Sequence, residues 1–104
     1  MKQIIRVKVY DNTSTLDEQN QKILQVATMN IVAMTSALFV GSKGEGGEGV
    51  ALNPVEDCFC GIELLYQKAI PDELAEECRA SLERRLVNFY KMSDLDMNVE
   101  LTIE

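Results

Sequence analysis

Residues 15–40 read TLDEQNQKILQVATMNIVAMTSALFV, and this stretch decides how the rest of the chain is organised. No charge occurs from position 23 to position 42, in a chain of 104 residues of which 26% are charged. Thr15 and Glu18 fit a capping box, in which each side chain satisfies a free backbone N–H at the start of a helix. The stretch therefore predicts a helix that begins near Thr15 and enters the core or a partner.

The helical spacing of this stretch predicts two faces. The apolar face, which we expect to lie in the core, contains Ile23, Ala27, Ile31, Met34 and Leu38. The polar face, which we expect to be solvated, contains Glu18, Gln21, Lys22, Gln25 and Thr28. After Thr28 the polar side gives way to apolar residues, so little of the second half is expected to face water.

The end of the stretch has two alternatives in a soluble fold. Thr35-Ser36 is a weak helical dipeptide, so the helix can end near Met34 and residues 35–41 can form a strand. In the other alternative the helix continues to the glycines that follow. We adopt the strand, with residues 39–40 and 50–51 as the arms of a hairpin. A membrane span fits the uncharged length, but the polar residues within it argue against one.

Two stretches near the chain ends alternate between apolar and polar residues, IIRVKVY at 4–10 and MNVELTI at 97–103. A period of two is typical of a strand with one buried face. The solvated sides of the two strands carry opposite charges, namely Arg6, Lys8, Glu100 and Glu104. Because opposite charges favour pairing across a sheet, we expect these two strands to be neighbours.

Between these strands we expect two more helices. Asn53 and Pro54 suit the cap and the first position of a helix over residues 53–69, although Gly61 weakens it by about 1 kcal/mol. The alternation of residues 58, 60, 62 and 64 favours a strand instead, and the cap decides for the helix. Pro71 opens the other helix, whose acidic start and basic end suit the helix dipole. Its apolar stripe contains Leu74, Cys78, Leu82, Leu86 and Phe89.

These elements predict an α+β fold in one domain, residues 1–104. A small antiparallel sheet contains the N- and C-terminal strands and is covered on one face by about three helices. The predicted order is strand, helix, hairpin, helix, helix, strand. The long apolar helix exceeds what a small sheet can cover, so we expect a homodimer or higher oligomer.

Composition argues against several classes of function. The net charge of −7 repels nucleic acid and anionic membrane surfaces, so we expect neither as a direct partner. Histidine is absent, which removes the commonest general base and metal ligand. A hydrolase that uses paired carboxylates is a third hypothesis, but these pairs lie at expected helix starts and in a turn, where capping explains them. We expect no enzyme, no metal site and no cofactor.

The three cysteines, Cys58, Cys60 and Cys78, are odd in number for a disulfide framework and too few for a zinc site without histidine. We expect buried thiols that act as small hydrophobic side chains. No signal peptide opens the chain, so a reducing cytoplasm is the expected compartment.

The leading hypothesis is a small acidic protein-interaction module that docks on a basic protein surface. One version is an inhibitor that imitates the charge of nucleic acid, of the kind that phages direct at host defence nucleases. Glu76 and Glu83 have no basic residue four positions later, so we expect this side of the helix to be free of intrahelical partners. The expected contact residues are Glu45, Glu48, Glu56, Asp57, Asp72, Glu73, Glu76, Glu77 and Glu83.

The alternative hypothesis is a binding site for a small ligand in residues 41–49, which read GSKGEGGEG. A glycine-rich loop with a lysine can hold a nucleotide or similar anion through backbone N–H groups. The spacing differs from that of the nucleotide-binding P-loop, which requires lysine after the last glycine. The expected ligand-binding residues are Lys43, Gly44, Gly46 and Gly47.

Overall fold

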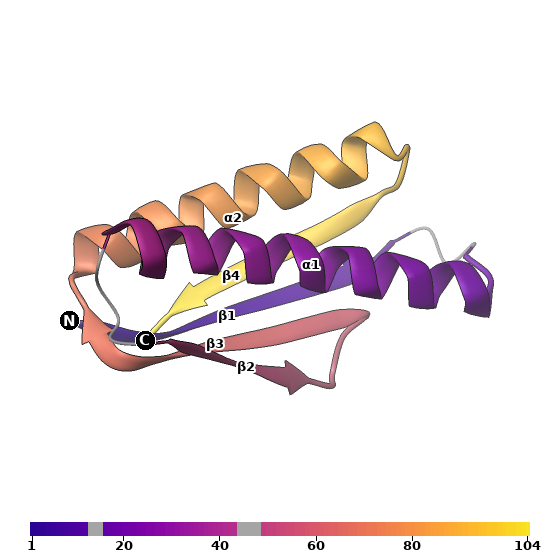
Figure 1. Ribbon diagram of the computed structural model, residues 1–104. Helices are drawn as coiled ribbons and strands as arrows, with labels where there is room; N and C mark the ends of the chain where they lie inside the picture. The colour runs from indigo at the N-terminus through magenta and orange to yellow at the C-terminus, as the bar shows by residue number, and fades with distance from the viewer. Residues whose placement is uncertain (13–15, 44–48) are drawn as a thin grey trace.

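The computed structural model describes residues 1–12, 16–43 and 49–104, with the side chains of residues 40–43 excluded. The elements are β1 (Lys2–Asp11), α1 (Glu18–Lys43), β2 (Val50–Val55), β3 (Cys60–Ile70), α2 (Asp72–Met92) and β4 (Met97–Ile103). The strands form an antiparallel sheet in the order β2-β3-β1-β4 (Figure 1). Each helix thus connects two strands that are separated by a third, which is the split β-α-β, or ferredoxin-like, arrangement.

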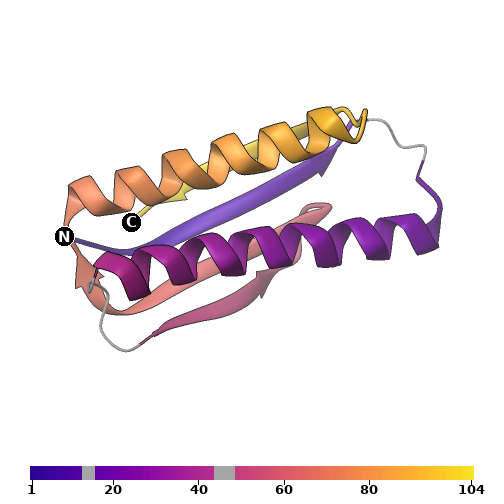
Figure 2. The ribbon, with the colours of Figure 1, turned by 45° about the horizontal axis from the view of Figure 1, so that its top comes forward.

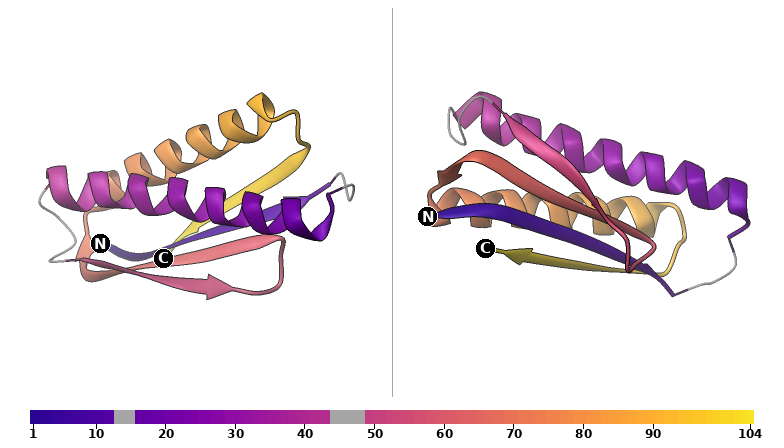
Figure 3. Two further views of the ribbon diagram at one scale, coloured as in Figure 1. Left: turned by 45° about the vertical axis from the view of Figure 1, so that its right-hand side comes forward. Right: turned by 90° about the horizontal axis from the view of Figure 1, so that it is seen from below.

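Both helices cover the same face of the sheet and run antiparallel to each other (Figures 1 and 2). Seen from below, the strands pass in front of α2, so that the sheet lies on the viewer's side of the helices (Figure 3, right). The core fills the space between these layers. Its fully buried members include Ile5, Val7 and Val9 of β1, Leu64 and Tyr66 of β3, and Leu82 and Leu86 of α2. The α+β class and the antiparallel sheet are therefore as predicted.

The pairing of β1 with β4 confirms that the two terminal strands are neighbours. Arg6 forms ion pairs on both sides of β1, with Glu104 and with Glu63 of β3, the latter at 3.0 Å between Nε and Oε2. Lys8 lies opposite Glu100 in the register, but its ion pair is with the β2–β3 connection. The predicted pairing of charges between the terminal strands is therefore formed by Arg6 and Glu104. Lys8 pairs with Asp57 instead.

The helix predicted over residues 53–69 is wrong, because this segment forms β2, a short connection and β3. Every second residue from Cys60 to Tyr66 is buried, so the alternation decides the fold here and the apparent cap does not. Gly61 allows the two strands to pair closely, since a Cβ at this position would lie only 2.6 Å from Val55 O on the neighbouring strand. Pro54 lies in the edge strand β2, where a missing N–H is tolerated.

The strand predicted at residues 35–41 is also wrong, because α1 continues through this segment. The predicted hairpin is therefore not formed, because residues 39–40 are helical. Its other arm, residues 50–51, is a strand as predicted, but it belongs to β2 and pairs with β3. The hydroxyl of Thr35 donates to Ile31 O at 2.7 Å, and that of Ser36 donates to Ala33 O at 2.9 Å. Hydroxyls that are bonded within the helix do not draw the backbone into another conformation. Two helices rather than about three therefore occur in the described part of the chain.

The first turn of α1 has a different cap from the predicted one. Thr15, the expected cap, lies outside the described residues. Asp17 acts as the cap, because its Oδ1 accepts a hydrogen bond from Asn20 N at 2.8 Å. Glu18 forms an exposed ion pair with Lys22 at 3.7 Å.

The helix predicted after Pro71 is confirmed as α2, which begins at Asp72. In its predicted apolar stripe, Cys78, Leu82 and Leu86 are buried. The two outer members, Leu74 and Phe89, are partly buried and pack against the edge of the core. This stripe and the β1 side chains form the centre of the core.

Candidate protein-interaction surface

The face that α1 turns toward the sheet is not the face predicted from the spacing. The buried side chains of α1 are Leu24, Thr28, Val32, Thr35 and Ser36. Thr28, which we expected in solvent, is 0% exposed, whereas Ile23 and Met34, which we expected in the core, are 59% and 62% exposed. α1 therefore buries its more polar face in the core and leaves its more apolar face outside.

Hydroxyl groups on the buried face are satisfied without water. Thr28 Oγ1 donates to Leu24 O at 2.8 Å, as Thr35 Oγ1 does to the carbonyl one turn before it. No buried side-chain nitrogen or oxygen in the described part of the chain lacks a hydrogen-bond partner. A hydroxyl bonded to its own helix costs little to bury, so threonine can replace an apolar residue here. For this reason the spacing of apolar residues alone did not indicate the buried face.

Thr28 also contacts Tyr90 of α2, at 2.6 Å between Oγ1 and the phenolic oxygen. Because the Thr28 hydrogen is directed at Leu24 O, the Tyr90 hydroxyl is the donor in this contact. We predict that Thr28→Val lowers the free energy of unfolding by about 1–3 kcal/mol, since it leaves the buried Tyr90 O–H without an acceptor. Denaturant unfolding monitored by circular dichroism measures this loss.

The double variant Thr28→Val/Tyr90→Phe is the control for this contact. Removing both polar groups leaves nothing unpaired, so we expect most of the lost stability to return. A double variant that is as unstable as the sum of the two single variants would show that the two hydroxyls are not coupled.

The outer stripe is the exposed apolar face of α1, formed by Ile23, Val26, Met29, Met34 and Leu38. It extends over about 23 Å, at a rise of 1.5 Å per residue. Between residues 23 and 39 no residue is charged, and the only exposed polar side chain is that of Asn30. Single exposed apolar residues are ordinary, but a continuous uncharged face of this length is typical of a surface that contacts another molecule.

A groove between α1 and α2 adjoins the outer stripe at Met34. It has a volume of about 340 Å³, and Phe89 and Met92 of α2 line its other side. Arg85 contributes the only charge to the lining, and its Nη1 donates to Thr35 Oγ1 at 3.4 Å. The groove widens the apolar surface from one helix to two.

By length and composition α1 resembles a membrane-spanning helix over Glu18–Phe39, and 28% of its most apolar window is buried. Such a composition also occurs where one face of a helix packs on a sheet. Here Leu24, Thr28 and Val32 are buried in the core, so the apolar surplus is confined to the outer stripe.

Arg79 corrects the expectation that Glu76 and Glu83 lack a partner on their own helix. Its Nε donates to Glu76 and its Nη1 donates to Glu83, both at 2.9 Å. Arg79 lies three residues after the first carboxylate and four before the second, both of which are facing positions on a helix. The hydrogen bond with Arg79 lowers the pKa of Glu76. Both carboxylates are therefore paired within α2.

Other predicted acidic contact residues lie toward the two ends of the molecule. Asp57 pairs with Lys8 Nζ at 3.1 Å, and Asp72 pairs with the N-terminal amino group at 2.7 Å. The β2–β3 connection, which holds Asp57, lies at the opposite end of the sheet from the start of α2 (Figure 1). Glu45 and Glu48 lie outside the described residues.

Three predicted acidic residues, Glu56, Glu73 and Glu77, are exposed and form no ion pair with any residue that the structure describes. Glu73 and Glu77 lie one turn apart on α2, while Glu56 lies in the β2–β3 connection. The nine predicted contact residues are thus distributed over separate regions. Among those on α2, Glu73 and Glu77 form no ion pair with a described residue and can contact a partner.

The cysteines do not form a reactive or metal-binding cluster in the described part of the chain. Cys60 and Cys78 are buried, and Cys58 is partly exposed. Burial raises the pKa of the Cys60 thiol to about 11 and also raises the pKa of Cys78. Both buried thiols are therefore protonated at neutral pH, in line with the prediction of small hydrophobic side chains for these two.

Thiol labelling gives a prediction for the folded protein. At pH 8 only about one Cys60 in a thousand is a thiolate, so labelling of this residue is slow even where a reagent can reach it. We expect Cys58 to react first with Ellman's reagent, and Cys60 and Cys78 to react only after denaturant is added. Rapid labelling of all three thiols in buffer would contradict the burial of these two.

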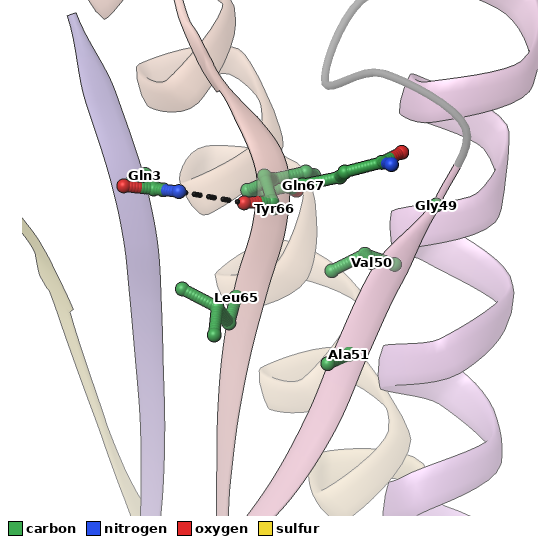
Figure 4. A pocket seen from close by; sticks show the side chains of 7 residues that line it. All are labelled: Gln3, Gly49, Val50, Ala51, Leu65, Tyr66 and Gln67. Carbon is green, nitrogen blue, oxygen red and sulfur yellow. Dashed lines mark hydrogen bonds between the residues drawn. The ribbon is translucent and has the colours of Figure 1, made fainter.

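A hollow of about 490 Å³ lies where β3 passes between β1 and β2 (Figure 4). Gln3 of β1 bounds it on one side, residues 49–51 on the other, and residues 65–67 between them. Gln3 Nε2 donates to Tyr66 O at 3.0 Å, which holds the two central strands together at this point. None of these lining residues is charged.

This hollow borders the predicted ligand loop at Gly49. Gly44, Gly46 and Gly47 lie outside the described residues, as does the side chain of Lys43. The described lining supplies amides and apolar groups, so a charged contact to an anion would have to come from the loop itself.

No protein-family model matches the chain, and no curated protein or solved structure matches it at a significant level. Function is therefore inferred from the surfaces of this molecule alone. Among the surfaces that the structure describes, the outer stripe is the one that packing within the monomer leaves unexplained.

Proposed function

We propose that this protein acts by binding another protein chain through the outer stripe of α1, and not by catalysis. The proposal rests on the face that α1 leaves exposed: Thr28 is buried, while Val26 and Met34 are exposed. An isolated monomer would gain more from the reverse arrangement, because the hydrophobic effect grows with the apolar area removed from water. The exposed stripe is explained if another protein covers it.

The available side chains support binding over catalysis. Histidine is absent, and the two buried thiols have raised pKa values, so neither is an activated nucleophile. Four of the predicted acidic residues are held in ion pairs within the protein. The chemistry that remains on the surface is that of apolar contact and charge.

A basic partner suits this function. The net charge of −7 attracts positive surfaces over a distance. Glu73 and Glu77 are exposed on α2, the helix that packs beside α1. Charges of this kind mainly accelerate association with a basic surface. In this proposal the outer stripe binds a protein chain, and Glu73 and Glu77 attract a basic partner to a separate surface of α2.

A photo-crosslinking amino acid at Val26 tests the proposal in fresh lysate of the cells that produce the protein, irradiated at low and at high salt. Thr102, on the opposite face of the sheet, is the matched control site. We expect one discrete crosslinked product from Val26 and from Met34, none from Thr102, and no loss of product at high salt, because apolar contacts are not screened. A product from Thr102 alone, or one lost with salt and with Glu73→Gln/Glu77→Gln, would move the contact away from the stripe.

A second candidate function is the binding of a small anion at the hollow beside Gly49. The hollow has the volume of a small-ligand site and adjoins the predicted loop. A nucleotide panel should then raise the melting temperature, and Lys43→Ala should remove that rise. If no nucleotide changes the melting temperature, this function is excluded.

A further inference from the structure

We propose that the outer stripe is covered by the outer stripe of a second copy of this chain, with the two α1 helices antiparallel about a two-fold axis near Asn30. The inference rests on the proposed function and names the chain that is bound. A second copy fits the stripe because the pattern of the stripe complements itself.

The pattern of the stripe is nearly symmetric about residue 30. In an isologous contact each residue faces a position equally far from the axis on the other side. Ile23 and Leu38 lie almost equally far from Asn30, as do Val26 and Met34. Antiparallel packing therefore places apolar side chains opposite apolar side chains along the whole stripe.

Asn30 occupies the centre of this arrangement. It is the only exposed polar side chain between residues 23 and 39, and burial against an apolar partner would leave its amide unpaired. An amide both donates and accepts hydrogen bonds, so two Asn30 side chains that meet at the axis can satisfy each other. A single polar asparagine in an apolar helix contact is a known device for fixing register.

The electrostatics of α1 also suit a second copy. Residues 23–39 carry no charge, so the contact buries none. Antiparallel helices place the positive end of each helix dipole near the negative end of the other. The exposed carboxylates of α2 and of the β2–β3 connection lie outside the stripe, so the repulsion between two copies of charge −7 acts at a distance and is reduced by salt.

Sedimentation of the purified full chain over a wide concentration range tests the proposal. A stripe of one helix gives a small interface, so we expect a dimer that dissociates on dilution and associates more strongly as salt rises. Val26→Glu should weaken the dimer on the order of 100-fold, because it places like charges in an apolar contact. Thr102→Glu, the same added charge on the open face of the sheet, should leave the dimer unchanged.

Thiol crosslinking tests the orientation independently of any charge variant. In a Cys58→Ser background, a mixture of Ile23→Cys and Leu38→Cys chains should form the heterodimer with a short bifunctional thiol reagent, while each variant alone stays uncrosslinked. Asn30→Cys alone should crosslink to itself. Crosslinking of Ile23→Cys to itself would indicate a parallel contact and overturn the proposed axis.

Two results would overturn the second copy as the occupant. One is a chain that stays monomeric at every concentration and salt level. The other is a dimer that Val26→Glu does not weaken although circular dichroism shows a native fold. In the first case a product from Val26 in the photo-crosslinking experiment would preserve the proposed function with a different partner, so the two proposals fail separately.

Discussion

Leu82→Ala is expected to lower the free energy of unfolding by about 2–5 kcal/mol. Leu82 is fully buried in the middle of α2, within the cluster that joins this helix to the sheet. Truncation removes apolar area from the core and leaves a cavity that the tightly packed neighbours fill only in part. Urea unfolding at a fixed protein concentration measures the loss, and the midpoint should fall by a large fraction of its value.

Val87→Ala is the matched control on the same helix. Val87 is 46% exposed, so its truncation should change the free energy of unfolding by no more than about 0.5 kcal/mol. Equal effects of the two substitutions would mean that α2 does not face the sheet as described.

Gly61→Ala is expected to destabilise the protein by about 1–3 kcal/mol, although it adds a single methyl group. The new Cβ would lie 2.6 Å from Val55 O and 2.8 Å from Val55 Cβ. These atoms belong to the paired strand β2, so relief requires the hairpin to open rather than one side chain to turn. Thermal unfolding should show the loss, and hydrogen exchange should increase first in β2.

Gly49→Ala gives the matched glycine control, because a Cβ at this position has no atom within 4 Å. We expect this variant to be neutral or slightly stabilising, since alanine restricts the unfolded chain. If Gly61→Ala were equally neutral, the close approach of β2 to β3 would be refuted.

The sequence predicted the elements in which pattern and packing agree. The alternation in 4–10 and 97–103 and the stripe of α2 each turn toward the core the residues that the pattern indicates, fully buried in β1 and partly buried in β4. These three elements were therefore predictable. The charges of Arg6 and Glu104 even indicated that the terminal strands are neighbours. In these elements local preference and tertiary contact point to the same structure.

The prediction failed where two local signals competed. Asn53 and Pro54 resemble a helix start, but the same residues fit an edge strand, and only the partner strand decides between them. Gly61 carried the useful signal, since a glycine inside an alternating run indicates close approach of another backbone. In a helix this glycine would be a weakness, whereas here it marks a point where the backbone of β2 lies close to that of β3.

The face of α1 could not be predicted from hydrophobicity, because its apolar residues occur on both sides. Leu24 and Val32 with three hydroxyl residues were buried, and the larger apolar set that includes Ile23 and Met34 was left outside. A prediction from the spacing of apolar residues takes the most apolar face of a helix as the buried one, and it assumes that the helix has a single neighbour. α1 contacts both α2 and the sheet, which breaks that assumption, and the apolar face that remains outside is the surface that we propose for binding.

The central place of β1 has a consequence for synthesis on the ribosome. The first strand to be made has both of its neighbours, β3 and β4, much later in the chain. The sheet cannot be completed until residues 97–103 have left the exit tunnel, and such distant pairing slows folding. Until β3 pairs with β1, α1 has no sheet to cover and its apolar side chains stay exposed, so a nascent chain of this protein should depend on chaperones more than its small size suggests.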